Sequence, residues 1–136
     1  MKKIILTSTI IFLLTGCFGE VGKGYITKTC TKNENIGQIK ILKEINIKSK
    51  SDEIINIEIK EKYDTKESAD AIKQSKISEQ KLYKNIDGIT LDIKENEYIY
   101  KIDPLVVSND IKEKFEIKDE QHKQIELYTE LGYTCK

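Results

Sequence analysis

The stretch GQIKILKEINIKSKSDEIINIEIKEKY, residues 37–63, decides the fold class of this chain. On both sides of the polar turn at residues 49–52, apolar residues recur at every second position and alternate with lysine, glutamate and asparagine. The recurring residues are Ile39, Ile41, Ile45 and Ile47 before the turn, and Ile55, Ile57, Ile59 and Tyr63 after it. Successive side chains of a strand point to opposite faces, so the pattern predicts two half-buried strands that form a long antiparallel hairpin.

The residues on either side of this hairpin predict one more strand and a helix. Upstream, Tyr25–Thr31 is expected to be a short strand, and the polar Lys32–Gly37 segment a turn. Downstream, Asp64 and Glu67 have the spacing of a capping box, which predicts a helix that runs to about Asn85. The apolar face expected for this helix comprises Ala69, Ile72, Leu82, Tyr83 and Ile86, and it is interrupted by Lys76 and Glu79.

The C-terminal half repeats the order of strands followed by a helix. Residues 89–93 and 98–103 alternate as a second hairpin, and Pro104 marks a strand end because it cannot donate a ladder bond. Residues 108–118 fit no single element. A final helix is expected with Asp119 as its N-cap, with Ile125, Tyr128 and Leu131 inward and Gly132 at its end. We therefore expect an α+β domain over residues 25–136: an antiparallel β-sheet (two hairpins plus a short N-terminal strand) with two helices packed on one face.

The N-terminus has the layout of a secretory signal peptide over residues 1–16. Lys2 and Lys3 are followed by an apolar run from Ile4 to Leu14 and then by the small residues Thr15 and Gly16. The run is about eleven residues long, too short to cross a bilayer as a helix. A buried first helix of the domain is the alternative interpretation.

Cys17 follows this signal directly, and Leu14-Thr15-Gly16-Cys17 resembles the lipobox of bacterial lipoproteins. The resemblance implies cleavage before Cys17 and attachment of diacylglycerol to its thiol, with palmitate-type acyl chains as the anchor. Residues 17–24 would then be the lipidated N-terminus and a glycine-rich tether. The implied location is the outer, extracytoplasmic face of the cell membrane. An ordinary signal peptide with a chance cysteine remains the alternative.

Cys30 and Cys135 remain for the folded domain. Export would place them in an oxidising compartment, where the simplest state of two thiols is a disulfide. Two free thiols and a metal site are the alternatives. A structural zinc site needs three or four ligands at close spacing, and the only histidine, His122, has no cysteine near it in sequence. We expect no metal and no cofactor.

The mature chain also resembles small bacterial lipoproteins of the YehR type. The similarity lies in the segments KTCTKNENIGQIKILKEINIK and LYKNIDGITLDIKENEYIYKI, in Tyr63 before a helix, and in a C-terminal helix that ends in Leu-Gly-Tyr. This chain departs from the pattern by carrying Cys30 and Cys135 and by a shorter stretch between Asp103 and Asp119. The resemblance implies an anchored α+β domain, and it implies no catalytic residue.

The remaining residues give little sign of chemistry. The 23 lysines are matched by 23 acidic residues, so there is no basic excess for nucleic acid. His122 is interpreted as a surface residue. Tyr98 and Tyr100 on one strand face could form a stacking platform, although core packing is the favoured interpretation.

These observations favour a non-catalytic, membrane-anchored lipoprotein that binds an envelope or extracellular partner, such as a protein or peptide. The sheet's open face or an edge strand is the expected contact surface, and the oligomeric state stays open. A small carboxylate-based envelope hydrolase is the alternative. It would require two acids that converge in a cleft, at least one of them with a raised pKa.

Overall fold

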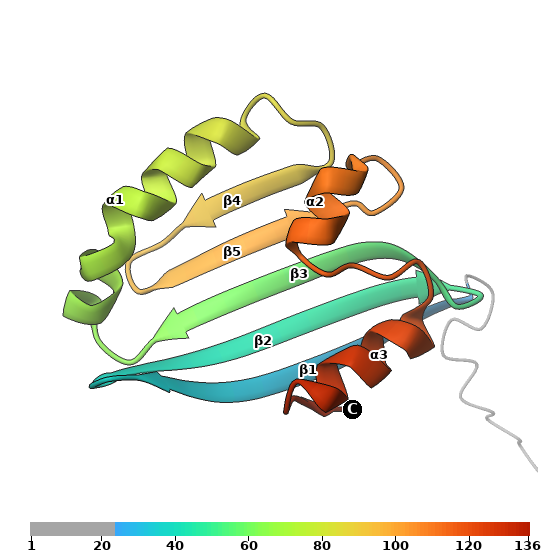
Figure 1. The fold of residues 1–136 in the computed structure, drawn as a ribbon, viewed down its shortest axis with the longest axis horizontal. Helices are drawn as coiled ribbons and strands as arrows, with labels where there is room; N and C mark the ends of the chain where they lie inside the picture. The colour runs from blue at the N-terminus through green and yellow to red at the C-terminus, as the bar shows by residue number, and fades with distance from the viewer. Residues whose placement is uncertain (1–23) are drawn as a thin grey trace, which may run out of the picture.

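The computed structural model describes residues 24–136, so the predicted signal peptide, Cys17 and the tether up to residue 23 lie outside the described residues. Those described form one antiparallel sheet of six strands in the order β4-β5-β3-β2-β1-β6, with helices on one face (Figure 1). The strands are β1 (Tyr25–Ile36), β2 (Ile39–Lys50), β3 (Glu53–Tyr63), β4 (Ile89–Ile93), β5 (Glu97–Ile102) and β6 (Thr134–Cys135). The expected α+β class is confirmed. Among residues 24–136, none of the helices is long and apolar enough to cross a membrane.

The first strand is longer than the sequence suggested. Residues 32–36, expected to be a turn, pair with β2 as far as Ile36 opposite Ile39, and the reversal occurs at Gly37, whose φ is +61°. Polar residues can occupy both faces of the strand here because this tip of the hairpin is exposed to solvent. On its inward parity, Glu34 meets Lys43 of β2 at 2.8 Å. The alternation of apolar and polar residues therefore did not predict this part of the strand, where neither face is covered by a helix.

Helix α1 (Lys66–Tyr83) packs on the sheet beside β4 and β3. Its N-cap is Thr65, whose hydroxyl accepts a hydrogen bond from the Ser68 amide at 3.1 Å. The capping role predicted for Asp64 is therefore wrong, because the Asp64 amide still donates to the Lys40 carbonyl across the sheet. Leu82 was also misplaced: it is 66% exposed, since the inward stripe of the helix is shared by apolar and charged residues.

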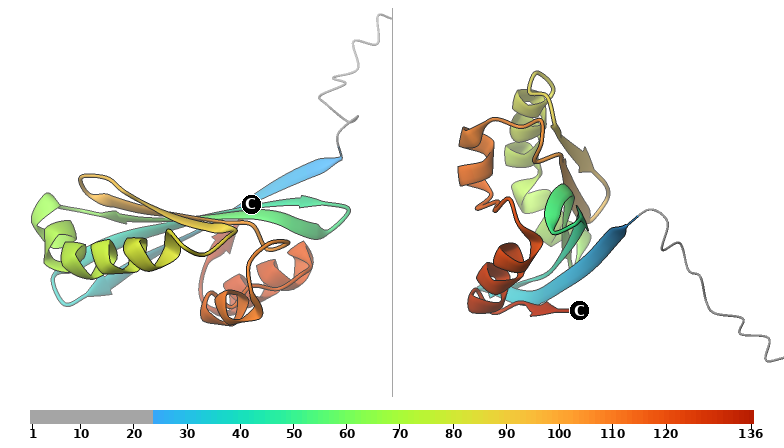
Figure 2. Two further views of the ribbon diagram at one scale, coloured as in Figure 1. Left: turned by 90° about the horizontal axis from the view of Figure 1, so that it is seen from above. Right: turned by 90° about the vertical axis from the view of Figure 1, so that its right-hand side faces the viewer.

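Two shorter helices complete the same layer, on the same face of the sheet as α1 (Figure 2). These are α2 (Asn109–Lys114), in the segment that the sequence left open, and α3 (Gln121–Glu130). The cap of α3 is Glu120 rather than Asp119, and Glu120 makes no side-chain capping bond. Instead, the carboxylate of Asp52, in the β2–β3 turn, accepts the His122 amide at 3.1 Å.

The core lies between the sheet and the helices. It is built from the inward parity of the strands, and its most buried members are Cys30, Ile47, Ile54, Ile57, Tyr98 and Ile102. The alternation predicted this parity for β2 and for β3 from Ile57 on. Ile55 was also predicted inward, but Ile54 is buried in its place, because the pairing register shifts between Lys48 and Ser49. The opposite face is polar and carries no helix, with contacts such as Thr29 to Asn46 at 2.7 Å and Lys60 to Glu44 at 3.3 Å.

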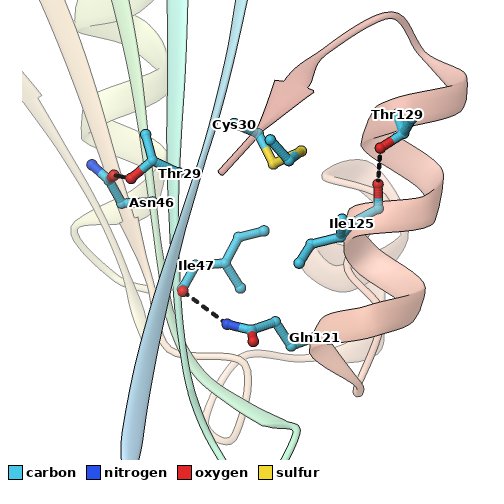
Figure 3. The surroundings of a disulfide bond; sticks show 8 residues. Thr29, Cys30, Asn46, Ile47, Gln121, Ile125 and Thr129 are labelled. Atoms are coloured by element: carbon cyan, nitrogen blue, oxygen red, sulfur yellow. Dashed lines mark hydrogen bonds between the residues drawn. A yellow bond between two sulfur atoms is a disulfide. The ribbon is translucent and has the colours of Figure 1, made fainter.

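A disulfide joins the two ends of the described chain. The Cys30 and Cys135 sulfurs are 1.99 Å apart, as the disulfide prediction expected, and Cys30 is fully buried. The bridge pins β6 to β1, and backbone bonds between Thr29 and Lys136 extend the pairing. Figure 3 shows the sulfurs above the space between Ile47 of β2 and Ile125 of α3. The bridge therefore closes the C-terminal segment over the sheet.

Candidate binding site between the helices

A cavity of about 190 Å³ opens on the helix-bearing face of the sheet, between the α1–α2 side and α3. Its floor is the cross-strand pair Ile45 and Ile59 of β2 and β3. The other residues that line it are Lys43, Glu61, Tyr100, Phe115, Glu116, Tyr128, Leu131 and Tyr133. We call this space the cleft. Its apolar floor and mixed walls are typical of small ligand sites.

Aromatic rings form two walls of the cleft. On one side, the Tyr100 and Phe115 ring centroids lie 5.3 Å apart in an edge-to-face arrangement. On the other side, Tyr128 and Tyr133 lie 5.2 Å apart. Such pairs are rigid and amphipathic, which suits them to hold a partner group without a large loss of side-chain freedom.

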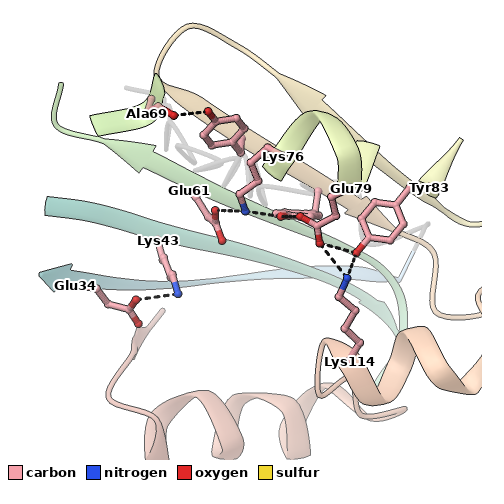
Figure 4. Close-up of polar contacts among 10 residues, drawn as sticks. Glu34, Lys43, Glu61, Ala69, Lys76, Glu79, Tyr83 and Lys114 are labelled. Atoms are coloured by element: carbon pink, nitrogen blue, oxygen red, sulfur yellow. Dashed lines mark hydrogen bonds and ion pairs between the residues drawn. The ribbon is translucent and has the colours of Figure 1, made fainter. Parts of the chain in front are cut away.

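An ion pair closes one end of this aromatic arrangement. Lys76 of α1 lies 2.7 Å from Glu61 of β3, with side-chain exposures of 13% and 17% (Figure 4). The Lys76 ammonium also donates to the Tyr100 hydroxyl oxygen at 2.5 Å and lies 4.8 Å from the Tyr100 ring centroid. The charge of Lys76 is thus satisfied by a carboxylate, a hydroxyl and an aromatic ring.

Glu79 is the centre of a second polar cluster, one helical turn further along α1. It accepts hydrogen bonds from the hydroxyls of Tyr83 and Tyr100, both at 2.8 Å, and from Lys114 of α2 at 3.0 Å. Burial pushes the pKa of Glu79 upward, but these three donors outweigh it and hold the pKa below its ordinary value. Burial, the charge of Glu61 and the bond to Glu79 raise the pKa of Tyr100, which therefore remains a protonated donor.

Lys43 of β2 lies at another rim of the cleft, and it is paired in register with Glu61 of β3. It bonds Glu34 at 2.8 Å, and this bond, working against burial, raises the pKa of Lys43 above its ordinary value. Lys32 closes the same rim: its ammonium bonds the Leu131 carbonyl at 2.7 Å and lies 5.4 Å from the Tyr133 ring centroid. The lysines at both rims of the cleft are therefore paired with carboxylates.

Charged residues at positions expected to be apolar could have indicated this site from the sequence. Lys43 and Glu61 occupy the inward parity of two strands otherwise lined by isoleucine, and they face each other in register. Lys76 and Glu79 interrupted the predicted apolar face of α1. They lie close to this pair, because Lys76 contacts Glu61 and Glu79 accepts a hydrogen bond from Tyr100. Charged residues that break an inward pattern on three neighbouring elements could have indicated a polar site within the core. Tyr98 and Tyr100 pack in the core, with exposures of 1% and 3%, as favoured.

His122 lies on the surface, more than half exposed, as the sequence suggested. Its Nδ1 contacts the Asp52 carboxylate, and its Nε2 lies 3.5 Å from Glu120. One potential ligand atom from each of Asp52, Glu120 and His122 lies within 4.8 Å of the other two, a spacing compatible with binding of a metal cation. Both ring nitrogens are engaged by carboxylates on different sides, however, and this suits an ion-paired clamp between α3 and the β2–β3 turn better.

A second hollow, of about 480 Å³, lies at the tip of the sheet near the β1–β2 turn and is lined mostly by polar and charged residues. Asn33, Asn35 and Asn96 contribute amides to it, and Lys62 and Asp64 contribute charges. The Asn96 side chain is already bonded to the Tyr63 carbonyl at 3.2 Å. We place the candidate site in the smaller cleft because only there do aromatic walls and interior charges converge.

The fold and cleft together define a small, disulfide-closed antiparallel α+β domain with an aromatic recess on its helical face. No family model matches the chain, and no curated protein matches it in sequence. Its fold is similar to that of a protein from Streptococcus pneumoniae TIGR4, whose structure was determined by NMR. The two share 14% identity with a TM-score of 0.56, over all of this chain and 97% of the other. At this identity, the likeness supports the fold alone.

Proposed function

We propose that this chain is a lipid-anchored extracytoplasmic lipoprotein that binds an envelope or extracellular partner and performs no catalysis. The observation that carries the proposal is the disulfide between Cys30 and Cys135. Such bridges persist in oxidising compartments, which agrees with the signal-like N-terminus and the lipobox-like sequence before Cys17.

The cleft is the proposed partner site. The lysines at its rims are already paired, and its walls are rings with little freedom to lose, so it suits an apolar side chain of a protein or peptide. Its volume of about 190 Å³ admits one such group rather than a folded ligand.

The chemistry of the carboxylates favours binding over hydrolysis. A carboxylate-based hydrolase needs a general acid with a raised pKa. Glu79 and Glu34, two of the acids bonded to lysines near the cleft, have lowered pKa values because their hydrogen bonds and lysine partners outweigh burial. Both are therefore held ionised, the state opposite to that of a proton donor.

Intact mass of the protein purified from membranes, with and without reductant and alkylation, tests the anchor and the bridge together. We expect a chain that begins at Cys17, carries a diacylglyceryl mass, and gains two alkyl groups only after reduction. A mass without lipid would overturn the anchor. Two alkyl groups without reduction would overturn the bridge.

Partner binding is tested separately by crosslinking on intact cells. Leu131→Glu places a charge at the cleft, where Leu131 is 42% exposed, while Leu105→Glu makes the same change at a loop residue that is 60% exposed and outside the cleft. We expect Leu131→Glu to abolish a crosslinked species that Leu105→Glu retains. Equal yields from the two variants would exclude the cleft as the partner site.

A further inference from the structure

The end of the sheet where β1 begins carries exposed apolar side chains. Tyr25 and Ile26, the first two residues of the strand, are 45% and 53% exposed. They lie on opposite faces of the strand, so each face of the sheet carries an exposed apolar side chain at this end. This end also contains the β2–β3 turn and the start of α3, and the β1–β2 turn lies at the opposite end of the sheet (Figures 1 and 2).

Two lysines accompany these apolar residues. The ammonium groups of Lys48 and Lys50 lie 4.7 Å and 5.9 Å from the centroid of the Tyr25 ring. Within residues 24–136, neither lysine has a carboxylate within ion-pair distance. Their charges are therefore available to an external anion. We call Tyr25, Ile26, Lys48 and Lys50 the basal patch.

Most acidic groups at this end already have a side-chain partner. Asp52 contacts His122, Asp119 contacts Lys112 at 2.9 Å, and Glu120 contacts Lys123 at 2.7 Å; Glu53, opposite Lys50 in register, makes no such contact. The basal patch itself therefore carries the positive charge of Lys48 and Lys50, with the Glu53 carboxylate opposite Lys50 in register.

The basal patch is held in place by α3. The Gln121 side chain donates to the Ile47 carbonyl at 3.1 Å, a bond that Figure 3 shows, and to the Ile26 carbonyl at 3.4 Å. Tyr25 is paired with Lys50 in the antiparallel register. The patch is therefore part of the folded sheet and not a loose end of the chain.

Chain length places this patch close to the proposed anchor. Eight residue steps separate Cys17 from Tyr25, and whatever their conformation they span at most about 28 Å. A lipid on Cys17 would therefore keep the basal patch within reach of the headgroup layer. Tyrosine with flanking lysines is the composition typical of protein surfaces at that layer.

We propose that the basal patch rests on an anionic lipid surface, with Tyr25 and Ile26 in the interface and Lys48 and Lys50 on lipid phosphates. The inference rests on the proposed lipidation of Cys17. It sets the domain upright, with the β1–β2 turn pointing away from the membrane. The twelve residues of β1 then place that turn and the polar hollow about 40 Å out.

The test supplies the anchor chemically, so that it does not depend on lipidation in cells. The chain from Cys17 to Lys136, which contains every residue the structure describes, is coupled through its free Cys17 thiol to a maleimide lipid. The carriers are vesicles of phosphatidylglycerol and phosphatidylcholine, or detergent micelles. Lysines are then acetylated and quantified by mass spectrometry. Lys40 and Lys62, exposed on the strands near the far end of the sheet, serve as internal controls.

We expect acetylation of Lys48 and Lys50 to fall at least threefold on the vesicles relative to micelles, while Lys40 and Lys62 change little. Equal change at all four lysines would overturn the basal patch even if the mass of the cellular protein confirms the lipid. Conversely, protection at Lys48 and Lys50 would support the patch even if the cellular protein carries no lipid.

Two variants distinguish contact of the basal patch with the lipid from mere proximity imposed by the tether. Tyr25→Ser with Ile26→Ser removes the apolar part of the patch, and Ile36→Ser removes an apolar residue that is 62% exposed at the other end of the same strand. We expect the double variant to lose the protection of Lys48 and Lys50 and Ile36→Ser to keep it. Protection that survives the double variant would show that tether length alone produces it, and would overturn the proposal.

Discussion

The two buried tyrosine hydroxyls of Tyr98 and Tyr128 have opposite surroundings. Tyr98 donates to the Ala69 carbonyl at 2.7 Å, whereas the hydroxyl of Tyr128, a ring of the cleft wall, has no partner among the described residues. Removing a bonded hydroxyl leaves a buried carbonyl unsatisfied, and removing an unbonded one relieves a desolvated group. We therefore expect Tyr98→Phe to cost about 1 kcal/mol of unfolding free energy and Tyr128→Phe to be neutral or stabilising.

Urea denaturation of both variants beside the wild type measures this difference, with each serving as the control for the other. The two changes remove the same atom from rings of similar burial. A loss of stability in Tyr128→Phe equal to that in Tyr98→Phe would mean that the Tyr128 hydroxyl is bonded in solution.

The Lys76–Glu61 pair should be stronger than the surface pairs of this protein. Lys76→Met leaves the mostly buried Glu61 carboxylate without its partner, and we expect a loss of about 2 kcal/mol. Lys101→Met is the matched control, because its pair with Asp92 is about half exposed, and it should cost less than about 1 kcal/mol. Adding Glu61→Gln to Lys76→Met should recover part of the loss. Denaturant midpoints that are alike for the two single variants would contradict this ranking.

At the scale of the elements, Glu79 couples α1 to α2 and to the sheet. Its folded-state pKa lies below the ordinary value of 4.5, so the unfolded chain binds the proton more readily. The stability that this carboxylate contributes is full above about pH 4.5 and is lost as the pH falls through the folded pKa. Glu79→Gln should therefore show a smaller drop in unfolding free energy between about pH 6 and pH 3 than the wild type.

The control for this experiment is Glu126→Gln on α3, an exposed glutamate outside the cluster. It should keep the wild-type dependence on pH. If Glu79→Gln and the wild type lose the same free energy on acidification, the cluster around Glu79 does not carry the acid sensitivity.

The elements also show where sequence patterns hold and where they stop. The alternation around residues 37–63 predicted β2 and β3 because one face of each is buried. It missed the last five residues of β1, where polar residues occupy both parities up to the exposed Ile36 at the tip of the hairpin. Caps failed for a different reason: α3 takes its capping carboxylate from Asp52, 70 residues away, which no local pattern reveals. The cleft likewise depends on charges that meet only when β3 and α1 are packed.

At the scale of the whole molecule, the disulfide joins residues 105 positions apart. In the chain-entropy model, a loop of this length contributes about 4 to 5 kcal/mol by restricting the unfolded chain. We expect reduction of the wild-type protein to lower its unfolding free energy by roughly this amount, measured by urea denaturation with and without reductant. A reduced protein as stable as the oxidised one would mean that the core alone sustains the fold.

The position of this bridge also determines how the molecule responds to mechanical load. Tension applied between the two chain ends enters at β1, reaches Cys30 within six residues, and crosses a covalent bond to Cys135, next to the last residue. The 105-residue separation, on the order of 350 Å of extended backbone, is therefore shielded from the force. Pulled from its ends, the domain would yield only its outermost residues while the sheet and the cleft keep their shape.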